Sequence, residues 1–133
     1  MNLNNEARGF RNNNPGNIRH GEPWLGLAED QTDPDFCQFV SVEYGIRAIF
    51  KILEIYREKY HLTTIDDIIS RWAPPTENDT RSYIDTIYRY MRWVQGVAIP
   101  RAQFPRLIGA IIHEENSAQP FNINFINCCK DAE

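Results

Sequence analysis

The chain has 133 residues, of which 42% are hydrophobic and 24% are charged, and its formal net charge is −4. This size suits one domain with its own core. We therefore expect a single domain over residues 1–133, with residues 1–7 as a flexible tail. A mildly acidic chain lacks the basic surface that nucleic-acid binding usually needs, and no apolar run reaches the roughly 18 residues of a membrane span. Neither nucleic acid nor a membrane is expected as a partner.

The first residues, MNLNNEARGF, lack the basic-then-apolar pattern of a signal peptide. We expect synthesis in the cytoplasm, so any action outside it would need a separate delivery route. The three cysteines, Cys37, Cys128 and Cys129, have neither metal-ligand spacing nor an even count for disulfides. We expect reduced structural thiols, no metal site and no cofactor.

The first 40 residues are rich in turn-forming residues and contain one strand-like stretch, FCQFV at residues 36–40. This composition predicts loops with a small β-hairpin. After this region the apolar spacing becomes helical, at i, i+3, i+4 and i+7. Helices are expected over residues 42–60, 63–72, 78–93 and 104–116. The predicted fold class is therefore mainly α, an α+β arrangement with a small N-terminal β element.

Three of these helices carry start signals. The second begins with a threonine followed three residues later by an acid, the capping-box arrangement. Either Asp79 or Thr80 can cap the third helix, and Pro105 suits the first turn of the fourth.

The last expected helix carries the sharpest chemical signal. At about 100° per residue its apolar side chains share one face, and Glu115 falls near the middle of that face. Burial of a carboxylate is costly and favours its protonated form, which a general acid working near neutral pH needs. The alternative is that the helix ends near residue 114, which would put Glu115 in water. His113 falls on the solvent side, so we expect it to be a surface residue.

Four motifs in order resemble a family found in bacteriophages and prophages, often described as virion structural proteins. They are RGFRNNNPGNIRHG, FCQFVSVEYGIRA, RWAPPTENDTRSYI and AIIHEENSAQPF, and the resemblance covers about residues 8–126. The last is also similar to the stretch of soluble lytic transglycosylases in which an AII helix ends in Glu-Ser-Gly. In this alignment Glu115 takes the position of the catalytic glutamate, while Asn116 and Ser117 replace the serine and the glycine.

The front of the chain resembles peptidoglycan glucosaminidases of the flagellar type. The stretches NPGNIR, WLG, FCQFVS and WAPPTENDTRSYI occur in the order in which similar motifs follow the catalytic glutamate of that family. Here the glutamate-bearing helix comes last. The resemblance therefore implies a circularly permuted lysozyme-like domain, which is plausible because domain termini commonly lie close together at the surface.

The resemblance implies cleavage of the MurNAc-GlcNAc β-1,4 bond of peptidoglycan by a muramidase, either a lytic transglycosylase or a lysozyme-type glycoside hydrolase. Glu115 would be the general acid. A hydrolase normally adds a second carboxylate, and Glu77 is the first candidate for it. A transglycosylase needs no second carboxylate, because the 6-hydroxyl of the sugar attacks. Further candidates are Asp79 and the acids of the predicted hairpin loop, Asp30, Asp33 and Asp35. Asp79 is better explained as an N-cap.

Substrate binding is expected from amide side chains and from aromatic rings that stack on sugars. The candidates are Asn14, Asn17, Trp24, Tyr44, Trp72 and Asn116. The alternative is that the asparagines form turns with their own backbone and that at least one of the aromatic rings belongs to the core.

Two other functions remain open at this point. The chain can be a non-catalytic virion or tail component that binds the cell wall, or an antibacterial effector delivered by cell contact. The expected partners are peptidoglycan glycan strands together with other virion or delivery proteins. The expected place of action is the bacterial cell wall or periplasm after delivery, or the virion.

Overall fold

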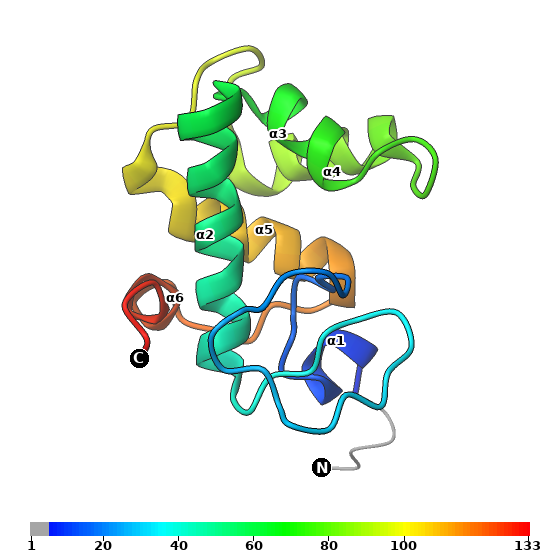
Figure 1. Cartoon of the computed structure of the whole chain (residues 1–133). Helices are drawn as coiled ribbons and strands as arrows, with labels where there is room; N and C mark the ends of the chain where they lie inside the picture. The colour runs from blue at the N-terminus through cyan, green and yellow to red at the C-terminus, as the bar shows by residue number, and fades with distance from the viewer. Residues whose placement is uncertain (1–5) are drawn as a thin grey trace.

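The computed structural model describes residues 6–133, and helices dominate it (Figure 1). The helices are α1 Arg8–Arg11, α2 Val42–Tyr60, α3 Ile65–Trp72, α4 Thr80–Met91, α5 Phe104–Asn116 and α6 Ile123–Cys129, with the 3-10 turn η2 Arg101–Gln103 directly before α5. The prediction of a mainly α fold is confirmed. Of the predicted flexible tail, residues 1–5 lie outside the described residues. None of the described helices is both long and apolar enough to cross a membrane.

The starts of α3 and α4 follow their capping signals. The Thr64 side chain accepts a hydrogen bond from the backbone N–H of Asp67, and Asp79 accepts one from the N–H of Ser82. These side chains satisfy backbone donors that have no partner within the helix. Helix α4 ends earlier than predicted, because Arg92 adopts a left-handed conformation with φ of 53°.

Helix α5 is the central element of the fold. It packs against α1, α2, α4 and α6, and in Figure 1 it crosses behind α2, with α3 and α4 above it and the N-terminal loop below. Its apolar stripe, Leu107, Ile108, Ile111 and Ile112, is completely buried. The C-terminal end of α5 therefore lies between the helical half of the molecule and the N-terminal loop.

The predicted N-terminal β-hairpin is not formed as regular strands. Residues 12–41 follow an irregular path with two isolated antiparallel bridges, one between Arg19 and Phe36 and one between Leu27 and Phe39. The physical reason is that the asparagine run takes up backbone groups that a neighbouring strand would otherwise use. The N–H of Phe39, for example, donates to the carbonyl oxygen of Asn12 at 2.9 Å.

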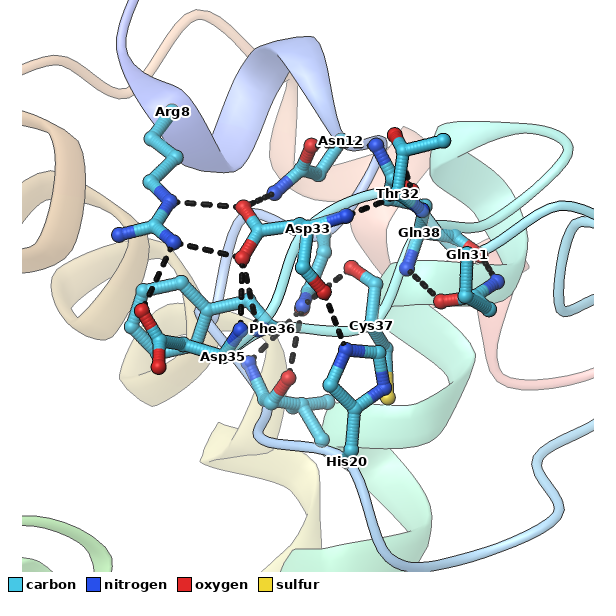
Figure 2. Close-up of polar contacts among 12 residues, drawn as sticks. Arg8, Asn12, His20, Gln31, Thr32, Asp33, Asp35, Phe36, Cys37 and Gln38 are labelled. Atoms are coloured by element: carbon cyan, nitrogen blue, oxygen red, sulfur yellow. Dashed lines mark hydrogen bonds and ion pairs between the residues drawn. The ribbon is translucent and has the colours of Figure 1, made fainter.

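The carboxylate of Asp33, whose side chain is 9% exposed, ties α1 to this loop, as Figure 2 shows. The guanidinium of Arg8 and the amide of Asn12 donate to Asp33 at 2.7 and 2.9 Å, and the backbone N–H groups of Asp35 and Phe36 add bonds of 2.9 and 3.0 Å. These donors, Arg8 foremost, hold the pKa of Asp33 well below its usual range. The loop is thus fixed by charge-assisted hydrogen bonds in place of a sheet.

Asn14 explains a second part of the asparagine run. Its side chain is fully buried, and its two amide hydrogens go to the carbonyl oxygens of Ile18 and Cys37, both at 2.9 Å. Its own amide oxygen accepts from the N–H of Ile18 at 3.0 Å. Asn14 therefore serves the fold of the loop, which is the turn-forming alternative considered for these residues.

Candidate functional site

Glu115 lies in the last turn of α5, on the packed side that the sequence indicated. The helix continues through Asn116 and ends at Ser117, which has a φ of 59°, so Glu115 remains partly buried. Both carboxylate oxygens accept a hydrogen bond. The amide of Asn17 donates to Oε1 at 3.0 Å, and the hydroxyl of Tyr83 donates to Oε2 at 2.7 Å. Three separate segments of the chain thus meet at this carboxylate.

Tyr83 comes from α4 and is buried except for 5% of its surface. Desolvation, reinforced by the charge of Glu115, raises the pKa of Tyr83 well above its usual range. The phenol therefore stays neutral at any ordinary pH. Because a phenol can both donate and accept, it can donate to an ionised Glu115 and accept from a protonated one.

Asn17 reaches Glu115 from the N-terminal loop. Its backbone is left-handed, with φ of 50°, a conformation that asparagine tolerates better than most residues. The loop is attached to α5 by Asn116, whose amide donates to the carbonyl oxygens of Pro15 at 2.8 Å and Ile112 at 3.0 Å. Asn116 is buried and does not line the groove, so it holds the loop that carries Asn17.

A groove of about 310 Å³ opens beside the carboxylate. Its walls are formed by the loop after α1, by α2, and by the segment from the end of α3 to residue 78. It brings together four of the residues that the sequence singled out: Asn17, Trp72, Glu77 and Glu115. Phe36, Tyr56, Arg19 and Arg71 complete its aromatic and charged lining.

Glu77, the candidate second carboxylate, is exposed and forms an ion pair with Arg19 at 3.3 Å. Both residues line the groove. The two candidate carboxyl groups therefore differ in setting, since Glu115 is held by neutral donors and Glu77 by a cation.

The remaining predicted site residues lie elsewhere. Trp24 lines a second hollow that adjoins the groove. Tyr44 faces a different part of the surface, next to α6, where its hydroxyl donates to the carbonyl oxygen of Glu133. Asp79 caps α4, and Asp33 accepts a hydrogen bond from the guanidinium of Arg8.

Sequence reasoning missed Tyr83 as a site residue, because its helical position placed it on the core face of α4. The signal available was its hydroxyl, since a buried tyrosine usually finds a hydrogen-bond partner. His113 is partly buried and not simply exposed as expected, and its ring packs on that of Tyr90 with centroids 4.9 Å apart. Within residues 6–133, no group of three or more His, Cys, Asp or Glu side chains is arranged to hold a metal ion.

Comparison with known proteins identifies a phage relative. No protein-family model matches the chain. The chain is 40% identical over 134 aligned residues to Protein P5 of Pseudoalteromonas phage PM2, and the alignment covers 93% of this chain and 80% of that protein. The phage association predicted from the motifs is confirmed by this similarity. The chain belongs to the family of phage proteins that includes Protein P5 of Pseudoalteromonas phage PM2.

Proposed function

We propose that this protein cleaves the MurNAc-GlcNAc β-1,4 bond of peptidoglycan, with Glu115 as the general acid. The observation that carries the proposal is the setting of this carboxylate, which lines a groove and is held through both oxygens by neutral donors from two other segments. Within residues 6–133 no lysine or arginine forms an ion pair with Glu115, whereas Asp33 is fixed in its ionised form by Arg8. A group that must give up and regain a proton needs a setting without a permanent cationic partner, such as that of Glu115.

The lining of the groove supports a sugar ligand. The aromatic rings of Trp72 and Tyr56 offer apolar faces, while Asn17 and Asn78 offer amides from two different walls of the groove. Binding sites of this kind combine apolar and aromatic surface with a few polar groups that fix orientation. A volume of about 310 Å³ also falls within the range of small-ligand sites.

The proposed mechanism uses Glu115 as the acid and the Tyr83 phenol as its hydrogen-bond partner. Protonated Glu115 gives its proton to the glycosidic oxygen as the bond to the MurNAc anomeric carbon breaks through an oxocarbenium-like state. The 6-hydroxyl of the same sugar then attacks that carbon and loses its proton to the ionised Glu115, which leaves a 1,6-anhydro end. Tyr83 accepts a hydrogen bond from the acid form and donates to the carboxylate form, so it supports both halves of the cycle.

The ion pair of Glu77 favours a transglycosylase reaction over hydrolysis. This pairing with Arg19 engages the carboxylate that a hydrolase would need as its second catalytic group. The family relationship to a phage protein supports a place of action at the host cell wall or in the virion. A virion or wall-binding protein without turnover is the competing function, and the same phage relationship favours it.

The test is a digest of purified peptidoglycan with the fragments identified by mass spectrometry. Wild type is compared with Glu115→Gln and Glu77→Gln, and Glu114→Gln is the matched control because it changes the neighbouring acid, which does not line the groove. The expected result is 1,6-anhydro ends that disappear only with Glu115→Gln. Reducing ends that disappear with either Glu115→Gln or Glu77→Gln would indicate a hydrolase. Absence of fragments from folded wild type on several wall types would refute the enzyme and leave the binding role.

A further inference from the structure

The groove beside Glu115 continues into a second hollow of about 750 Å³. Ile18, Arg19, Ile52, Tyr56 and Arg71 line both, so the two adjoin along a shared wall. Glu115 lines only the first, whereas Trp24, Lys59 and Tyr60 line only the second. A ligand bound at Glu115 can therefore extend from the site of bond cleavage into a region of different character.

Positive charge distinguishes this second hollow in a chain whose net charge is −4. Three cations line it, Arg19, Lys59 and Arg71, against a single carboxylate, Glu22. Arg19 already forms an ion pair with Glu77 of the first groove. In the part of the chain that the structure describes, neither Arg71 nor Lys59 forms an ion pair.

The two unpaired cations lie on the same aromatic ring. The guanidinium carbon of Arg71 is 3.7 Å from the centroid of the Tyr60 ring, and the Lys59 ammonium is 5.3 Å from it. Stacking on a ring face restrains a guanidinium while its N–H groups remain available to an anion. His20 also lines the hollow, and its ring is turned to the carbonyl oxygen of Asp33, 2.7 Å from Nε2.

We propose that this hollow binds a carboxylate of the stem peptide carried by the glycan strand, an inference that rests on the proposed function. The sugar hydroxyls and N-acetyl groups of a glycan strand are uncharged, so its negative charge comes from carboxylates on the muramyl side chains. A guanidinium binds a carboxylate through two parallel N–H donors. Arg71 and Lys59 therefore provide selection for peptide-bearing strands over bare glycan.

The experiment measures binding to the Glu115→Gln variant, so that the ligand stays intact. The probes are a MurNAc-GlcNAc tetrasaccharide with its stem peptides, the same compound with the peptide carboxylates amidated, the peptide-free tetrasaccharide that keeps its lactyl carboxylates, and chitotetraose. We expect the peptide-bearing probe to bind at least about tenfold more tightly than the others. Adding Arg71→Gln or Lys59→Gln should remove most of this preference. Lys51→Gln is the control. Lys51 is exposed, lies on α2 like Lys59, and lines neither the groove nor the second hollow.

The outcomes separate this inference from the function on which it rests. Equal affinity for the peptide-bearing and amidated probes, or an unchanged preference in Arg71→Gln, would overturn the inference while leaving cleavage untouched. In another outcome, the peptide-free muramyl probe binds as tightly as the peptide-bearing probe, with an affinity that still depends on Arg71. That result would assign the bound anion to the lactyl group and would also overturn the inference. Selective binding by a protein whose wild type releases no fragments would refute the cleavage reaction alone.

Discussion

Replacement of Tyr83 by phenylalanine tests whether the hydrogen bond to Glu115 matters for the chemistry. The change removes one hydroxyl and keeps the buried ring, which is only 5% exposed. The bond it deletes is 2.7 Å long and ends on a carboxyl group. Hydrogen bonds to charged groups contribute about 1.5–3 kcal/mol, which corresponds to a loss of roughly 10- to 100-fold in kcat/KM if the bond is needed in the transition state.

The effect on folding should be much smaller than the effect on turnover. Glu115 is partly exposed and lines the groove, so water can replace the lost donor. We expect a loss of less than about 1 kcal/mol in the free energy of unfolding.

The assay is release of soluble fragments from peptidoglycan, with urea unfolding measured in parallel. Tyr90→Phe is the matched control, because Tyr90 lies on the same helix and is 44% exposed. Turnover by Tyr83→Phe within about twofold of wild type would refute the role assigned to this phenol. A large loss of stability, with turnover falling only in proportion to the unfolded fraction, would show that Tyr83 acts in packing alone.

Three further changes test the supports of the site. Asp33→Asn should lower the free energy of unfolding by about 2 kcal/mol at pH 7. Since the pKa of Asp33 is lowered in the folded state, its contribution is complete above the ordinary carboxyl value of about 4 and falls progressively as the pH drops from there toward the lowered pKa. The difference between wild type and variant in urea unfolding should therefore be smaller at pH 3 than at pH 7. Asn116→Ala leaves the Pro15 carbonyl without its side-chain donor and should cost about 1–3 kcal/mol and reduce turnover with it; unchanged stability would contradict this. Gly45→Ala places a methyl group against the carbonyl oxygen of Asn13, and thermal unfolding should show destabilisation of about 2 kcal/mol or more.

The helical part of the fold could be predicted from the sequence because its determinants are local. The stripe of isoleucines and leucines, Thr64 and Asp79 as caps, and Pro105 at the start of α5 all act within a few residues of one another. The same local periodicity placed Glu115 on the packed face. Helices α1 and α6 escaped prediction, because segments of four and seven residues are too short to display a period.

The supports of the carboxylate could not be predicted in the same way. Tyr83 is 32 residues from Glu115 in the sequence and Asn17 is 98 residues from it, and no local pattern relates residues so far apart. The composition of the asparagine run suggested ligand contacts, yet it did not distinguish Asn14, which is fully enclosed, from Asn17, which reaches the groove. Only the tertiary arrangement separates these two roles.

The separation of 98 residues between Asn17 and Glu115 also affects when the site can form during folding. Closing a flexible loop of that length costs about 4 kcal/mol of chain entropy, and contacts between distant residues form more slowly than those within helical hairpins. Helices α2 to α5 can associate through nearer neighbours, whereas the groove is complete only after the N-terminal loop has docked on the last turn of α5. Recovery of turnover during refolding should therefore lag behind recovery of the helical signal. Activity would then report the final stage of assembly of this domain.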